Sequence, residues 1–415
     1  MEFLNRFLLE DEDYKRLTKG INSDSFPIAL SGLTGIGKAV IASGVVSDEK
    51  RRLVMITDTE AAALGLKDDL TALGIKAGYL PARDYNLASA DGCSKEYEIM
   101  RIDTLSRIFG GDFAVVCASA EGATQYTLLP EVLAENIFRL SEGDSLDTSE
   151  FIRKLVNGGY KRSDICEGAG QFSVRGGIID VFSTGYDMPI RIELWGDEVD
   201  TVSFFDAATQ RRTVKTESVK ISPARELPYS APDLSRRLKT YLQNDGNLTV
   251  PQRQSIASDI ENLENGLGIN SDLYLPFLYK KCATLFDYTK DYCVALCDSA
   301  NIKSRFENLL LSEAGDVSDL LQSGLLSHKT SKIRLSKAEF QKSTEKAMYF
   351  ESFPHTAYPA APKTVVEFNL KRFSAWGGNL ENLIDDISGI RALSGTAVVF
   401  AGGDKAAKLL AGSLG

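Results

Sequence analysis

The chain has 415 residues, a net charge of −10 and an apolar fraction of 43%, which are typical of a soluble protein too long for a single hydrophobic core. The negative charge argues against attraction of nucleic acid to the whole surface, although a local basic groove is compatible with it. Because no apolar run is long enough to span a bilayer and the N-terminus lacks a signal-peptide layout, we expect a cytoplasmic protein.

The first segment alternates between strands and helices. Ser25–Leu30, Leu53–Thr57 and Phe113–Ala118 are predicted strands, and Lys38–Ser43 and Ser94–Phe109 are predicted helices. Such alternation indicates a mostly parallel sheet.

A glycine-rich octet joins the first strand to the first helix. It fits the spacing of a nucleotide-binding phosphate loop, with these candidate residues: Gly32, Thr34, Gly35, Gly37, Lys38 and Ala39. The backbone N–H groups of such a loop surround phosphates, and the lysine reaches the outer ones. Ala39 stands where a Ser or Thr hydroxyl would coordinate magnesium. We therefore favour a degenerate phosphate loop over an active one and over an unrelated strand-to-helix turn.

The pattern changes after about Gln125. Gln171–Val174, Ile178–Phe182, Ile190–Trp195 and Val199–Phe205 are short predicted strands separated by tight turns. In Ile190–Trp195, apolar residues alternate with Arg191, Glu193 and Trp195. This organisation predicts an antiparallel sheet with one solvated face.

Helices return from about Asp233, and Tyr292–Leu296 is a strongly apolar predicted strand. Asp298 follows it where a Walker B aspartate would bind the metal ion, but Ser299 stands where a catalytic Glu would be needed. The Pro-rich run Phe353–Pro362 indicates a linker. After it, Thr396–Phe400 is predicted to be a strand within a last, truncated βα unit.

Cysteine and histidine usage predicts no metal site. The six cysteines form no CxxC pair, and His328 and His355 lie far apart. We expect buried, reduced thiols.

Four segments carry a specific resemblance: Gly159–Arg162, Gly170–Phe182, Arg191–Val199 and Phe205–Asp206. They resemble the UvrA-binding domain of the UvrB repair helicases and, more closely, the equivalent part of the bacterial transcription-repair coupling factors, the Mfd family. Three departures favour the second family over UvrB. Ala39 and Ser299 break the two nucleotide motifs, and the short distance from Tyr85 to Ser94 leaves no room for the DNA-wedging hairpin of UvrB.

The resemblance implies an α/β fold in which a degenerate helicase-like parallel-sheet domain is split by an inserted α+β domain and followed by a small truncated α/β domain. The implied boundaries are 1–123 and 226–345 for the two halves, 124–225 for the inserted UvrA-binding domain, 346–362 for a linker and 363–415 for the small domain.

The resemblance also implies where UvrA binds. From Phe151 to Arg225 there are 11 Lys/Arg and 10 Asp/Glu, a net of +1, so acidic partner surfaces would be steered there. Arg162, Arg175 and Arg191 match family positions and are candidate contacts, with Phe172 and Phe182 as apolar anchors. The alternatives are that Arg191 and Glu193 simply take part in cross-strand pairs on a solvated face and that Phe182 belongs to the core.

The implied function is recruitment of UvrA in transcription-coupled excision repair, without ATPase activity in these residues. We expect no productively bound ATP or magnesium, although phosphate or sulfate fits the loop. RNA polymerase and duplex DNA would be bound by C-terminal domains beyond the sequence, one of which masks the UvrA face. The alternatives are a residual ATPase that uses Lys38 and Asp298, and a UvrB-like binder of damaged DNA.

Overall fold

The computed structural model describes residues 2–83, 95–324, 326, 327, 329, 332–369, 379–393, 397, 399 and 404–414. None of the helices in these ranges is long and apolar enough to cross a membrane.

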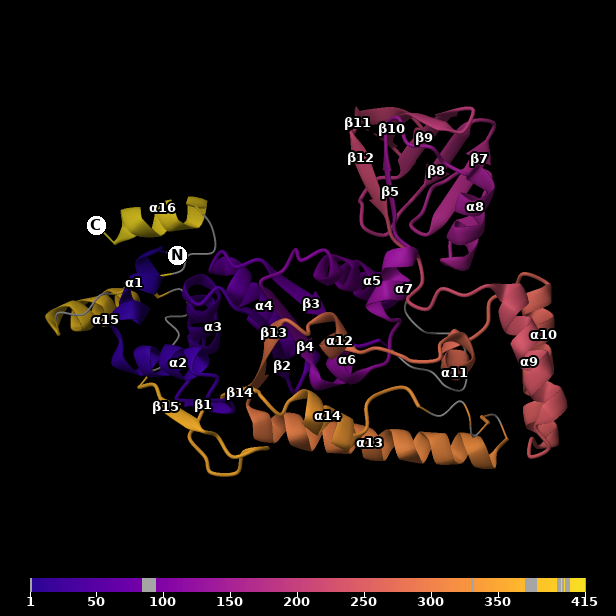
Figure 1. The fold of residues 1–415 in the computed structure, drawn as a ribbon. Coiled ribbons are helices and arrows are strands. Elements are labelled where there is room, and N and C mark those ends of the chain that lie inside the picture. The colour runs from indigo at the N-terminus through magenta and orange to yellow at the C-terminus, as the bar shows by residue number, and fades with distance from the viewer. Residues whose placement is uncertain are drawn as a thin grey trace.

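The main domain is built on a seven-stranded parallel sheet that combines segments from both ends of the chain (Figure 1). In spatial order its strands are β15 (Thr364–Glu367), β1 (Ile28–Ser31), β14 (Met348–Phe350), β13 (Tyr292–Cys297), β2 (Arg52–Thr57), β4 (Val115–Ser119) and β3 (Ala77–Leu80). Each neighbouring pair runs parallel. The predicted fold class, a parallel-sheet domain interrupted by an insertion, is confirmed.

Helices cover both faces of this sheet because its strands are apolar on both sides. Leu53 and Met55 of β2 pack on the first face, and Val54 and Ile56 pack on the second. The first face is covered by α2 (Glu12–Asn22), α3 (Gly37–Asp48) and α4 (Glu60–Ala72). The second face is covered by α5 (Lys95–Phe109), α6 (Ala120–Thr124), α12 (Leu285–Tyr288), α13 (Ser299–Gln322) and α14 (Lys337–Ser343).

The predicted linker 346–362 is wrong at its start. Met348–Phe350 is β14, fully buried between β1 and β13. Thr364–Glu367, predicted to open the small domain, is β15 and pairs with β1. Because these strands are short and prolines surround them, the sequence pattern did not predict that they belong to the sheet. The predicted strand Thr396–Phe400 falls largely outside the described residues, and α15 (Leu380–Ala392) and α16 (Asp404–Ser413) flank it.

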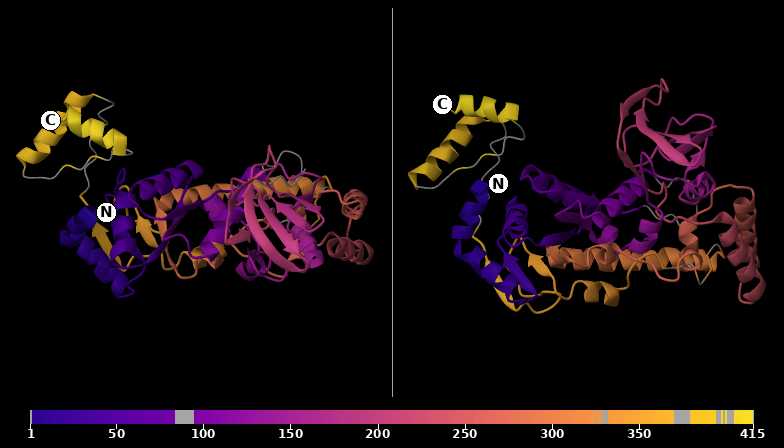
Figure 2. Two further views of the ribbon diagram at one scale, coloured as in Figure 1. Left: turned by 90° about the horizontal axis from the view of Figure 1, so that it is seen from above. Right: turned by 45° about the horizontal axis from the view of Figure 1, so that its top comes forward.

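An inserted domain projects from the main domain in Figure 1 and in the right view of Figure 2. Its six-stranded sheet has the order β11 (Arg212–Lys215), β10 (Glu198–Phe205), β9 (Ile190–Trp195), β8 (Ile178–Val181), β7 (Gln171–Arg175) and β6 (Lys161–Arg162). The pairs from β7 to β11 are antiparallel, as the turns predicted. A two-stranded ladder of β5 (Phe138–Ser141) and β12 (Ser218–Ile221) leads in and out, and α7 (Pro130–Glu135) precedes it.

A buried ion-pair cluster fixes the exit of the inserted domain to the main domain. The Glu226 carboxylate, fully buried, accepts hydrogen bonds from Arg101 Nε at 2.9 Å and Nη2 at 3.0 Å. Burial opposes ionisation of Glu226, but the charges of Arg101 and Arg83 outweigh it and lower the pKa of the carboxyl.

Beyond this point α9 (Ala231–Asn244) and α10 (Val250–Glu264) form a helical hairpin with a small core of its own.

Candidate functional site

The phosphate-loop sequence forms a strand–loop–helix unit between β1 and α3. Gly32 and Gly35 have positive φ angles of 77° and 57°, which explains glycine at both positions. A Cβ on Gly32 would also lie 1.9 Å from the carbonyl oxygen of Phe368. The loop is thus shaped by the neighbouring β15 strand as well as by its own sequence.

The structure brings together the two predicted remnants of the nucleotide site. Lys38, at the start of α3, forms an ion pair with Asp298, which directly follows β13. Ser352 donates its backbone N–H to Asp298 Oδ1 at 2.8 Å. Burial opposes the charge of Asp298, but the hydrogen bonds from Lys38 and Ser352 outweigh it and lower the pKa of this carboxyl.

The residues around this pair do not fit a nucleotide-bound magnesium ion. Ala39 is fully buried within the apolar core, so no oxygen lies at the position of the expected hydroxyl ligand. Ser299 donates its hydroxyl to Glu351 Oε1 at 2.5 Å. Among the described residues, no group of three or more His, Cys, Asp or Glu side chains is arranged to hold a metal ion. Glu351 and Ser352 had no sequence signal, because their proximity to the loop depends on β14.

The sheet of the inserted domain has one apolar face and one polar face. Ile179 of β8 and Ile192 of β9 point to the apolar face, where Phe151 and Leu155 of α8 (Thr148–Asn157) cover them. The polar face carries a row of directly paired residues across four strands: Ser173, Asp180, Arg191 and Ser203. The candidates Arg175 and Arg191 belong to this polar face, whereas Arg162 is in register with Phe172 of the apolar face.

Arg175 and Arg191 share one buried carboxylate but differ in exposure. Asp180, whose side chain is fully buried, accepts hydrogen bonds from Arg191 Nε at 2.7 Å and Nη2 at 2.9 Å. Arg175 Nη2 donates to the same carboxylate at 2.6 Å. The Arg191 side chain is 13% exposed and lies over the Phe205 ring, whereas the Arg175 side chain is 47% exposed. Arg191 is therefore placed to stabilise the sheet, and Arg175 is also available to a partner.

The other three candidate contacts differ in position. Arg162 is exposed on the edge strand β6, and Phe182 is half-buried after β8. Phe172 is fully buried in the domain core, so its side chain offers no surface to a partner in this structure.

Trp195 is a candidate that the sequence reasoning did not select. Its side chain is 85% exposed at the end of β9, just before the turn to β10. The β7–β8 turn lies beside it, because Leu194 N–H donates to the Gly177 carbonyl at 2.8 Å. Arg175, which enters that turn, and Trp195 are thus at the same end of the sheet. The alternation Arg191, Glu193, Trp195 already predicted an outward position for this residue.

Comparisons with known proteins match this domain and the whole chain. The family model "UvrB interaction domain" matches residues 138–227, which comprise the inserted domain from β5 through its exit. The transcription-repair-coupling factor of Bacillus subtilis (strain 168) is 27% identical over 98% of this chain and 35% of its own length. That of Staphylococcus aureus (strain bovine RF122 / ET3-1) is 27% identical over 78% of this chain and 28% of its own length.

The chain thus spans about a third of the length of these relatives. The family match and the similarity over nearly the whole chain agree with the resemblance seen in the sequence. The chain is thus similar to part of the bacterial transcription-repair-coupling factors, and its inserted domain matches the UvrB interaction domain model.

Proposed function

We propose that the chain acts in transcription-coupled repair as an adaptor that captures UvrA through its inserted domain. The observation that carries this proposal is the match of residues 138–227 to the UvrB interaction domain. The same residues form a part of the molecule that projects into solvent (Figure 1). A projecting domain presents a partner surface without obstruction from the main domain.

We place the centre of the docking surface at Trp195 and Arg175. Tryptophan and arginine are enriched among the residues that dominate binding energy at interfaces. An indole that is 85% exposed loses little by leaving water and gains a large apolar contact. Arg175, with its guanidinium held by Asp180, is already oriented, so less side-chain entropy is lost on binding.

We also propose that the phosphate loop does not support ATP hydrolysis. Ala39 supplies no magnesium ligand, Ser299 replaces the water-orienting carboxylate, and the charge of Lys38 is paired with Asp298. In this proposal, RNA polymerase and duplex DNA are bound by parts of the relatives that lie outside the matched third. The masking of the UvrA face is also assigned to those parts.

The test is capture of purified UvrA by the immobilised chain, comparing the wild type with Trp195→Ala and Arg175→Ala. Each change is expected to weaken binding by about 30-fold, which corresponds to about 2 kcal/mol for an interface hot spot. Alanine is preferred to glutamate at position 175, since a new carboxylate beside buried Asp180 would disturb the fold.

Arg153→Glu is the control. Arg153 is exposed on α8, which covers the apolar face of the sheet and lies away from Trp195. The Arg153→Glu variant should capture UvrA as well as the wild type does. Equal binding by the wild type and both alanine variants would remove this end of the sheet from the docking surface.

A further inference from the structure

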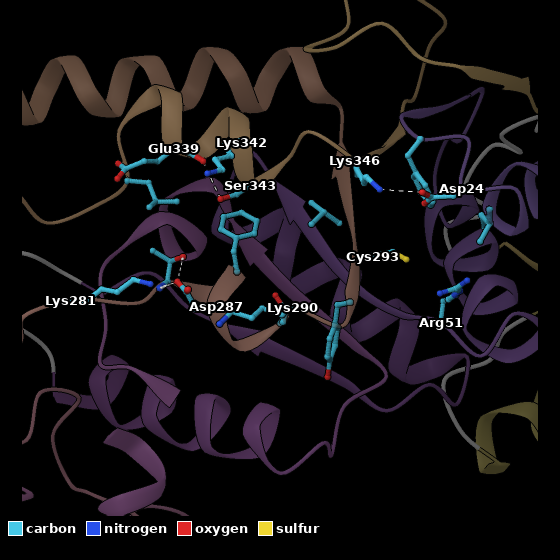
Figure 3. Close-up of a pocket in the computed structure, with 18 of the residues that line it drawn as sticks. Asp24, Arg51, Lys281, Asp287, Lys290, Cys293, Glu339, Lys342, Ser343 and Lys346 are labelled. Carbon is cyan, nitrogen blue, oxygen red and sulfur yellow. Dashed lines mark hydrogen bonds and ion pairs between the residues drawn. The ribbon is translucent and has the colours of Figure 1, made fainter. Parts of the chain in front are cut away.

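A second candidate site lies at the edge of the main sheet opposite the phosphate loop. A cavity of about 860 Å³ opens there, at the amino ends of β1, β2 and β13 (Figure 3). The phosphate loop and Asp298 lie at the carboxyl ends of the same strands, so the two sites are separated by the length of the sheet.

The cavity is lined by more basic than acidic side chains, although the whole chain carries a net charge of −10. The basic residues are Arg51, Lys281, Lys290, Lys342 and Lys346, and the acidic ones are Asp24, Asp287 and Glu339. They come from four separate stretches of sequence. In Figure 3, Lys281 and Lys290 lie on one side of the cavity, Lys342 and Lys346 on the other, and Arg51 toward one end.

The three carboxylates are already engaged. Asp24 Oδ2 accepts from Lys346 Nζ at 3.1 Å. Asp287 Oδ2 accepts the backbone N–H of Thr284 at 2.9 Å, and Glu339 Oε2 accepts that of Ser336 at 2.8 Å, so both cap helix starts. Within the described part of the chain, the other four cations form no ion pair with any carboxylate. Four basic groups around one cavity therefore lack an ion-pair partner, and the lining as a whole carries two more basic than acidic side chains.

We propose that this cavity is a binding groove for the phosphate backbone of single-stranded nucleic acid. Unpaired lysines on facing walls suit a chain of phosphates that passes between them, and aromatic rings in such a groove provide surfaces for bases. Phe286 is a half-buried ring in the lining. A duplex presents its phosphates on a convex surface and would not enter a cavity of this size.

The salt dependence of binding gives a quantitative test. Four phosphate contacts predict a slope of about −2.8 in log affinity against log salt for a single strand, or a loss of about 50-fold between 50 and 200 mM salt. The assay is fluorescence anisotropy of a labelled oligothymidine with the full chain. The triple variant Lys281→Glu/Lys290→Glu/Lys342→Glu should bind at least about tenfold more weakly, with a slope near −0.7.

A control variant with the same net charge as the groove variant distinguishes binding in the groove from attraction by the overall charge of the protein. Lys303→Glu/Lys405→Glu/Lys408→Glu changes three exposed lysines outside the cavity. It should retain wild-type binding within about twofold. Equal weakening by both triple variants, or no effect of the groove variant, would overturn the proposal. Thermal melting by circular dichroism checks that both variants are folded.

Two further measurements identify the ligand. Tighter binding of a duplex of the same length would contradict the single-strand assignment, and displacement of the oligonucleotide by equimolar pyrophosphate would identify a small-anion site instead.

Cys293, half-buried in the lining, provides an independent readout of where the strand binds. The oligonucleotide should slow its alkylation by N-ethylmaleimide, and unchanged alkylation at saturating oligonucleotide would place the strand elsewhere.

Discussion

Removal of the Asp180 carboxylate is expected to destabilise the inserted domain strongly. Asp180 is fully buried and accepts two hydrogen bonds from Arg191 and one from Arg175. Asp180→Ala would leave the Arg191 guanidinium, 13% exposed, without its counter-charge. Loss of one partner of a buried ion pair costs about 3–5 kcal/mol.

The two arginines should contribute unequally. The Arg175 side chain is 47% exposed, so solvent screens its attraction to Asp180 and its coupling energy should stay below about 1 kcal/mol. The bidentate contact of Arg191 should give a coupling energy of about 2–3 kcal/mol. Double-mutant cycles of Asp180→Ala with Arg175→Ala and with Arg191→Ala measure both values.

Hydrogen exchange followed by mass spectrometry is the suitable assay. The chain contains several domains, so a single global free energy of unfolding is not defined, whereas exchange of peptides from β7 to β10 reports the opening of this sheet alone. The reasoning would be refuted if Asp180→Ala changed the protection of these peptides by less than 1 kcal/mol. A coupling energy for Arg175 as large as that for Arg191 would refute the assigned roles.

Three further predictions concern the main domain and the thiols. Gly32→Ala should lower the hydrogen-exchange protection of peptides from β1 and β14 by about 3 kcal/mol, because its Cβ would meet the carbonyl oxygen of Phe368, which follows β15. The control Gly35→Ala has open space around it and should cost about 1 kcal/mol. Equal costs would exclude the contact as the cause. Because the pKa of Asp298 is lowered, its pair with Lys38 contributes stability above the unfolded pKa, near 4, and loses it as the pH falls through the folded value. Asp298→Asn should therefore lower the hydrogen-exchange protection of peptides from β13 and β14 by about 1–2 kcal/mol at pH 7 and by progressively less as the pH falls below about 4, and a difference that does not change with pH would contradict this. Burial raises the pKa of the Cys166 thiol to about 12, so iodoacetamide at pH 8 should label it only after unfolding, and rapid labelling of the native protein would show that it is accessible.

Local patterns predicted the parts of the fold that depend on local chemistry. The alternation in Ile190–Trp195 predicted which residues of β9 face the core, and the strand–glycine–helix pattern predicted the loop around Lys38. The proximity of Lys38 to Asp298, 260 positions later, agrees with the Walker B position predicted for Asp298, whereas their ion pair was not predicted.

Features that depend on tertiary contacts were not predictable from local patterns. The three-residue β14 is too short for a periodic signal, and its place in the sheet follows from burial between two longer strands. The burial of Phe172 against α8 and the sharing of Asp180 by two arginines also depend on strand register. The basic groove combines four distant stretches of sequence, none of which is unusually basic alone.

The most direct test of the central claim is calorimetric titration of purified UvrA into the full chain at physiological salt. The account predicts a saturable complex with wild-type protein and loss of most of the binding heat with Trp195→Ala/Arg175→Ala, while the hydrogen-exchange protection of the inserted domain is retained. No detectable complex with the wild type, or unchanged affinity of the double variant, would contradict it.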